Sequence, residues 1–202
     1  AGLWTGDQSI LAPGRRFLEN NPEVKSGLVI SFHQGPYNLL AEPFLAAGLN
    51  PVILLNPSAK ENFIESTAKL NKRLDHRGEV EWITVGEPGF VRRLFKVIKD
   101  GRPVLAYLDG NNGIDGMDGT RKNGMTYSLP GRDIRVRTGL ARLICRLQCP
   151  VHPVALHWSE GRELIWEKKP SQNWNRKDDP KQVTQLLYDW IFSEVMTRPE
   201  QW

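Results

Sequence analysis

Short apolar runs and amphipathic stretches alternate along most of the chain. The runs are rich in branched residues and only five to nine residues long, which is typical of buried β-strands. The intervening stretches repeat their apolar positions with helical spacing. The predicted strands cover 26–32, 51–55, 80–85, 103–108 and 150–158, with shorter extended pieces at 125–129, 133–136 and 163–167; the predicted helices cover 37–47, 59–77, 87–100, 138–147 and 180–197. This alternation predicts a single α/β domain whose central, mostly parallel (mixed) β-sheet is flanked by helices.

The length of 202 residues fits one domain, which we place at residues 26–202, with residues 1–25 as an N-terminal lead-in. The sequence contains no apolar run of about 18 residues, and its first ten residues do not resemble a signal peptide. Cys145 and Cys149 are too few for a disulfide framework, so we expect buried, reduced thiols. These features predict a cytoplasmic protein, with peripheral contact to the inner membrane at most.

The charge balance favours anionic partners. Lysine and arginine number 27 against 23 acidic residues, a formal net charge of +4. Such an excess suits phosphates, acidic carrier proteins or anionic lipid surfaces. It is too small to indicate nucleic acid, and no nucleic-acid-binding motif is present.

The segment from His33 to Asn38 (HQGPYN) carries the first candidate chemistry. His33 follows a predicted buried strand, a Gly-Pro turn comes next, and Asn38 lies at the start of the next predicted helix. An imidazole can act as a general base near neutral pH when a neighbour fixes its tautomer. Asn38 could fold back to do so. The alternative is a strand-end histidine that only bonds a loop carbonyl or caps a helix.

Asp109 ends the strand at 103–108 and opens a glycine-rich stretch. A calcium loop counted from Asp109 would need different residues at Gly113, Ile114 and Thr120, so we expect no metal here. The stretch is either an active-site loop or a solvated connector. Ligands of α/β sheets gather beyond the carboxyl ends of the strands, where both His33 and Asp109 are predicted to lie.

Arginines at alternate positions of the segment 131–140 form the third candidate. Arg135 and Arg137 would project to one face of a short strand, and Arg137 precedes a predicted helix start, which also favours anions. They could hold the phosphate of a phosphopantetheine arm or of a lipid acceptor. The alternative is a solvated basic edge strand.

Taken in order, these segments resemble the lysophospholipid acyltransferase superfamily, and within it the bacterial lipid A biosynthesis lauroyl/myristoyl acyltransferase family. The resemblance rests on a strand ending in H-x4-[acid], a strand ending in Asp before a Gly-rich loop, and three later segments. These later segments are Arg137–Leu143, Cys149–Val154 and the closing Arg198–Trp202 (RPEQW).

The resemblance implies a glycerol-phosphate-acyltransferase-like fold and a fatty acyltransferase. His33 would be the general base, supported by Asn38 and Asp109. The donor would be a thioester of acyl carrier protein or coenzyme A, with no further cofactor, and the acceptor a lipid, peptide or small molecule carrying a hydroxyl or amine. Substrate-binding positions would be Gly35, Tyr37, Glu42, Asn111, Arg135 and Arg137.

The sequence departs from this family at the position of Asn38, where the family usually has Asp or Glu. Asparagine can orient an imidazole but adds no negative charge, and Glu42 could supply it. The sequence also lacks the family's usual N-terminal membrane anchor, and it stops at Trp202, where relatives continue with a basic tail. Two other hypotheses therefore remain open: a non-catalytic relative that binds acyl chains or lipids, and a thioester hydrolase.

Overall fold

The computed structural model describes residues 12–57, 64, 78–109, 124–161 and 163–202. In chain order its elements are α1 (Ala12–Asn20), η2 (Pro22–Lys25), β1 (Gly27–Ser31), η3 (Tyr37–Leu39), α2 (Glu42–Ala46), β2 (Val52–Leu55), β3 (Glu81–Thr84), α4 (Phe90–Lys99), β4 (Pro103–Tyr107), β5 (Gly124–Leu129), β6 (Arg132–Arg137), α6 (Gly139–Leu147), β7 (Pro150–Trp158), β8 (Leu164–Lys168), β9 (Gln172–Asn173), α7 (Pro180–Thr197) and η5 (Pro199–Gln201). The helix predicted at 59–77 and the position of Asn111 lie outside the described residues.

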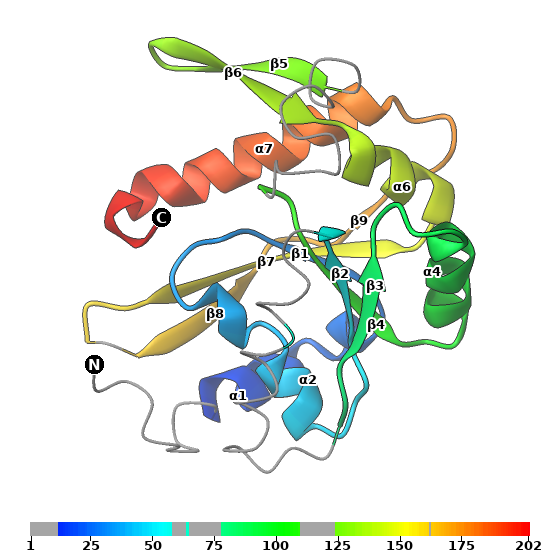
Figure 1. Cartoon of the computed structure of the whole chain (residues 1–202). Helices are drawn as coiled ribbons and strands as arrows, with labels where there is room; N and C mark the ends of the chain where they lie inside the picture. Colours follow the sequence, from blue (N-terminus) through cyan, green and yellow to red (C-terminus); the bar gives the residue numbers. More distant parts are fainter. Residues whose placement is uncertain (1–11, 58–63, 65–77, 110–123, 162) are drawn as a thin grey trace.

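The central sheet has the strand order β3-β2-β4-β1-β7-β8, with β9 paired to β7. The sheet is parallel from β3 through β2, β4 and β1 to β7. Strands β8 and β9 run antiparallel to β7. Helices cover both faces, with α1 and α2 on one side and α4, α6 and α7 on the other (Figure 1). The prediction of a single α/β domain with a mostly parallel, mixed sheet is therefore confirmed.

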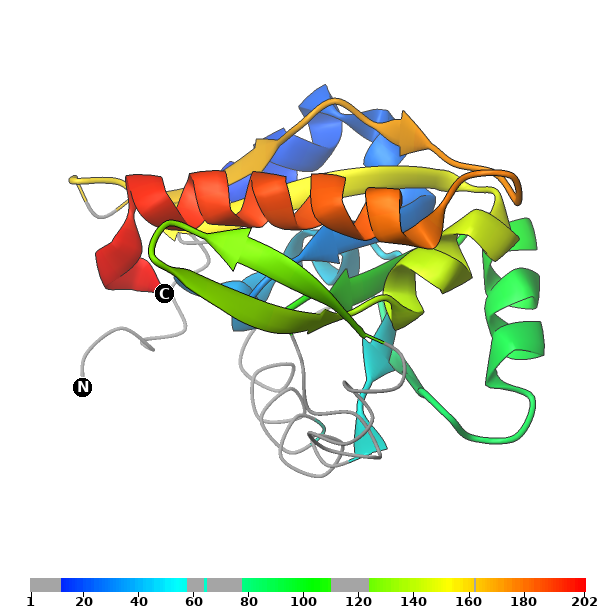
Figure 2. The ribbon, with the colours of Figure 1, turned by 90° about the horizontal axis from the view of Figure 1, so that it is seen from above.

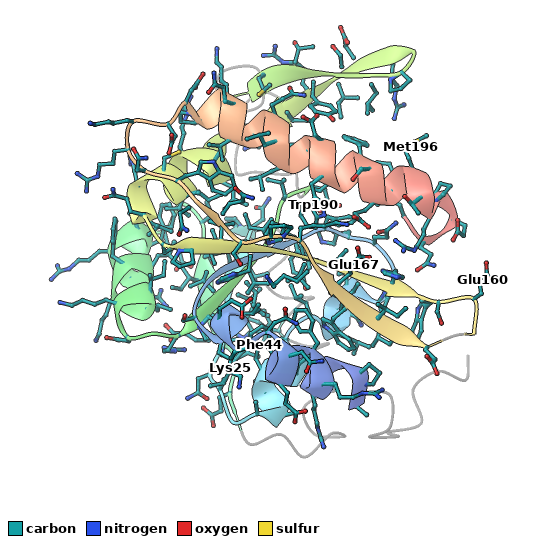
Figure 3. The ribbon with its side chains drawn as sticks, turned by 180° about the vertical axis from the view of Figure 1, so that it is seen from behind. Lys25, Phe44, Glu160, Glu167, Trp190 and Met196 are labelled. Carbon is teal, nitrogen blue, oxygen red and sulfur yellow. The ribbon has the colours of Figure 1, made fainter. Side chains whose placement is uncertain are left out.

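The alternation of side chains along β1 divides the core in two. Leu28, Ile30 and Phe32 pack with α4, α6 and α7, whereas Val29 packs with α1 and α2. All residues of β1 are buried, as expected of a central parallel strand with both faces covered. On the α7 side, the Phe32 ring meets Trp190 edge-on at 5.4 Å, and Figure 3 shows Trp190 between α7 and the sheet.

Two N-terminal segments differ from the sequence expectation. Residues 12–25, predicted as a lead-in, form α1 and η2 and contribute Phe17, Leu18 and Val24 to the α1/α2 core. The helix predicted at 37–47 is split into η3 and α2. Pro43 lies in the first turn of α2, where a backbone N–H would have no partner within the helix. In a continuous helix from Tyr37, Pro43 would lie in the interior, and its missing N–H would remove one backbone hydrogen bond.

Strands β5 and β6 form a separate hairpin that packs on α7 (Figure 2). Tyr127 of β5 stacks on Phe192 at 5.2 Å, and its hydroxyl donates to Asp189 Oδ1 at 2.8 Å. Helix α7 begins where the sequence predicts, with Asp179 as N-cap accepting from the Lys181 N–H at 3.0 Å. None of the helices in the described ranges has the length and apolarity needed to span a bilayer.

The predicted burial of both cysteines is confirmed. Cys145 and Cys149 are free and buried, and burial raises the pKa of both thiols, that of Cys149 to about 11. Neither is therefore a thiolate at neutral pH, which does not favour a role as nucleophile.

Two buried histidines of β7 make the fold sensitive to mild acid. Burial lowers the pKa of His152 and of His157, the latter further because of Arg198. An unfolded histidine titrates near pH 6.5, so below that pH the unfolded chain binds more protons than the folded one. We expect the free energy of unfolding, measured by urea denaturation, to decrease as the pH falls from 7 to about 5. Equal stability of the native chain at both pH values would contradict the assignment.

Candidate active site

The register of two neighbouring strands brings His33 and Asp109 together. Ser31 of β1 pairs with Tyr107 of β4, and the Leu108 N–H donates to the Ser31 carbonyl at 2.9 Å just beyond. His33 and Asp109 each lie two residues past the Ser31–Tyr107 pair. Because parallel strands end at the same edge of a sheet, the two side chains meet there, as the sequence predicted.

Asp109 holds His33 through both of its carboxylate oxygens. The His33 backbone N–H donates to Oδ2 at 2.9 Å, and His33 Nδ1 lies 2.7 Å from Oδ1. An ionised carboxylate only accepts hydrogen bonds, so in the neutral imidazole the proton lies on Nδ1 and the lone pair on Nε2. Nε2 has no hydrogen-bond partner in the described part of the chain. The imidazole is therefore oriented at one nitrogen and open at the other.

Exposure differs between the two side chains of this pair. The His33 side chain is 36% exposed, whereas that of Asp109 is 13% exposed. A substrate can therefore reach the imidazole while the carboxylate stays largely shielded from water. Such shielding strengthens the hydrogen bond between them relative to one in bulk solvent.

Two tyrosines enclose the imidazole. Tyr107 stacks on the His33 ring with centroids 4.9 Å apart, and Tyr37 meets it edge-on at 4.6 Å. The Tyr107 hydroxyl donates to the Tyr37 carbonyl at 2.7 Å, which ties η3 to β4. Burial, with smaller contributions from Tyr37 and Asp109, raises the pKa of Tyr107, so this hydroxyl stays protonated at neutral pH. The ring of His33 is thus fixed by contacts on two sides as well as by Asp109.

Asn38 does not orient the ring as the local sequence suggested. It lies on η3 with its side chain exposed, and Asp109 takes the hydrogen-bonding position at Nδ1. Glu42 is 1% exposed as the first residue of α2, and the charge beside the imidazole comes from Asp109 instead. The pairing joins residues 76 positions apart and depends on β4 lying next to β1 in the sheet.

Gly35 is required by the backbone that follows His33. Its φ is +55°, and a Cβ there would lie 2.9 Å from the Leu156 carbonyl oxygen and 3.2 Å from the His157 Cα. Only glycine adopts this conformation without strain and fits this close approach. The turn that follows β1 can therefore pack closely against β7.

The two candidate arginines belong to a different unit from His33 and Asp109. Arg135 is exposed on β6 and donates to Thr126 Oγ1 at 3.4 Å, whereas Arg137 is half-buried at the end of the same strand. Val136 between them is fully buried. The hairpin that carries them packs on α7 rather than joining the central sheet.

Comparison with known proteins identifies the family. A sequence profile described as bacterial lipid A biosynthesis acyltransferase matches residues 55–202, which is more than half of the chain. The match includes Asp109, both arginines and the closing RPEQW segment, and it begins after His33. No curated protein sequence gives a significant match.

Proposed function

Since the chain belongs to the bacterial lipid A biosynthesis acyltransferase family, whose activity is acyl transfer to a lipid acceptor, we propose that it transfers a fatty acyl group from a thioester with His33 as general base. The observation that supports this most directly is the His33–Asp109 pair, with Nδ1 bonded at 2.7 Å and the His33 side chain 36% exposed. The donor in this proposal is acyl carrier protein or coenzyme A, and the acceptor carries a hydroxyl or an amine.

In the proposed reaction, the lone pair of His33 Nε2 takes the proton of the acceptor as its oxygen or nitrogen attacks the thioester carbonyl. The C–S bond then breaks, and the resulting imidazolium returns its proton to the leaving thiolate. The products are an ester or amide and a free thiol. Asp109 keeps the ring in the tautomer that can accept this proton and stabilises the imidazolium that forms.

The site also suits a water molecule as acceptor, which would make the protein a thioester hydrolase. The 36% exposure of the His33 side chain favours keeping this second candidate. Purified chain should be incubated with a long-chain acyl thioester, with and without a lipid A precursor, and the products separated by mass spectrometry. Acylated lipid in the sample that contains the acceptor supports transfer. Free fatty acid released at the same rate in both samples supports hydrolysis, and thioester binding without turnover supports the non-catalytic relative.

The exposed position of Asn38 predicts that it contributes little to the orientation of His33. We expect Asn38→Ala to change the transfer rate by no more than about twofold, the effect of removing about 0.5 kcal/mol at a surface position. Steady-state kinetics with the same thioester measure this directly. A loss of about a hundredfold would instead give Asn38 a direct role in the reaction.

A further inference from the structure

The segment that closes the sequence lies against the residues that follow His33. Figure 1 shows the red end of α7 and η5 next to the blue segment after β1. We call η5, Pro199–Gln201, the PEQ turn. Its contacts involve the backbone of Gly35 and of Trp158, and the reaction proposed above assigns it no part.

Gln201 binds the end of β7 with its side-chain amide. Its Oε1 accepts from the Trp158 N–H at 2.8 Å, and its Nε2 donates to the Trp158 carbonyl at 2.9 Å. This side of β7 is open because β1 pairs with β7 only as far as Ile30 and Pro153. One glutamine side chain thus satisfies both backbone groups of Trp158, as a neighbouring strand would.

The same residue binds the segment after His33 with its backbone. The Gly35 N–H donates to the Gln201 carbonyl at 2.8 Å. A Cβ on Gly35 would lie 3.3 Å from Gln201 Oε1, so the two residues are in close contact. Gln201 therefore joins the end of β7 to the turn that carries the imidazole.

Gln34 makes a second connection between the same two segments. It is 1% exposed, and its Nε2 donates to the Arg198 carbonyl at 3.1 Å. Its own N–H donates to the Phe32 carbonyl at 2.9 Å, which closes a tight turn around His33. The two residues after His33 are therefore both bonded to the Arg198–Gln201 region.

An ion-pair network centred on the buried Glu194 holds Arg198. Arg198 Nη1 lies 3.3 Å from Glu194 Oε2, one turn back on α7, and Lys169 Nζ lies 2.8 Å from Glu194 Oε1. Lys169 is also 2.8 Å from Glu167 of β8, which Figure 3 shows facing α7. The Glu194 side chain at the centre of this network is only 7% exposed, and the network connects Arg198, which precedes the PEQ turn, to both α7 and β8.

We infer that Gln201 is a positioning residue for acyl transfer, acting through Gly35 to hold the His33 imidazole where Nε2 meets the acceptor. Asp109 fixes His33 from the β4 side, and the PEQ turn fixes the following backbone from the β7 side. The inference rests on the function proposed above. Without the PEQ turn, the His33–Asp109 pair would persist, but its direction relative to the bound acceptor would vary.

The test is Gln201→Met, which keeps the length and bulk of the side chain and removes both amide hydrogen bonds. We expect kcat per folded molecule to fall by about 10- to 100-fold, since a displacement of about 1 Å can cost about a hundredfold in rate. The KM for the acyl thioester should stay within about twofold, because the amide group of Gln201 is already bonded to the Trp158 backbone. Thr197→Ala, an exposed change one turn away on α7, serves as the matched control and should retain the native kcat.

A purely structural role gives a different result. In that case Gln201→Met would lower the urea midpoint while kcat per folded molecule stayed within about twofold of the native value, and the inference would be overturned. If Gln201→Met does not fold, Gln34→Met, which removes the bond to Arg198, tests the second connection between the same two segments, and it should also lower kcat without raising KM. If the native chain itself transfers no acyl group, the proposed function fails and the inference fails with it. If the native chain is active and Gln201→Met is equally active, only the inference fails and the proposed function stands.

Discussion

Replacing His33 with alanine is expected to lower the rate of acyl transfer by about 10²- to 10⁴-fold, the usual contribution of a general base. The physical reason is the lone pair on Nε2, which the hydrogen bond from Nδ1 to Asp109 leaves on that nitrogen. Without it, the proton of the acceptor must pass to water. The rate should be measured with labelled acyl thioester under saturating conditions, so that a change in binding does not hide the change in kcat.

A matched variant separates the loss of the base from the loss of packing. His33→Asn retains an N–H donor close to the position of Nδ1, so the hydrogen bond to Asp109 can persist, but it has no basic nitrogen. It should therefore be as inactive as His33→Ala while folding like the native chain. Native-like turnover by His33→Asn would mean that another group accepts the proton.

The sheet could be predicted from the sequence because each strand carries its own signal. The runs at 26–32 and 103–108 are apolar on both faces, which only a covered parallel strand explains, and both are found in the centre of the sheet as β1 and β4. The helix α1 was missed because its burial depends on α2 and β8, which are distant in sequence. The break between η3 and α2 could have been anticipated from Pro43 alone.

The candidate site was predictable in its residues but not in their pairing. Both His33 and Asp109 follow buried strands, which places them at one edge of a parallel sheet. Local spacing nevertheless favoured Asn38 as the partner of the imidazole, because it is only five residues away. Because β4 lies next to β1 in the sheet, Asp109 rather than Asn38 becomes the partner of the imidazole, and no local pattern encodes strand order. For the same reason, the contact between Gln201 and Gly35, which are far apart in the sequence, has no signal in either segment alone.

The second substitution with a large expected effect on the rate of acyl transfer is Asp109→Asn. In Asp109→Asn, the side chain keeps its shape, but one of its two acceptor oxygens becomes an NH₂ donor. The wild-type carboxylate accepts from both the His33 backbone N–H and Nδ1. An amide offers only one acceptor atom for these two donors, so the amide nitrogen either faces an N–H or forces the ring to give up its proton at Nδ1.

The second arrangement moves the imidazole proton to Nε2, where the lone pair is needed, and it also removes the negative charge that stabilises the imidazolium. We therefore expect Asp109→Asn to lower kcat by about 10³- to 10⁴-fold at neutral pH, as the loss of the orienting carboxylate does in serine protease triads. Asp189→Asn, the same change at an exposed carboxylate of α7, is the control and should remain active because its Oδ1 can still accept from Tyr127. The tautomer of His33 can be read independently from the ¹⁵N chemical shifts of its ring. A variant that retained native activity, with the ring proton still on Nδ1, would show that the carboxylate is not what prepares His33 to accept a proton.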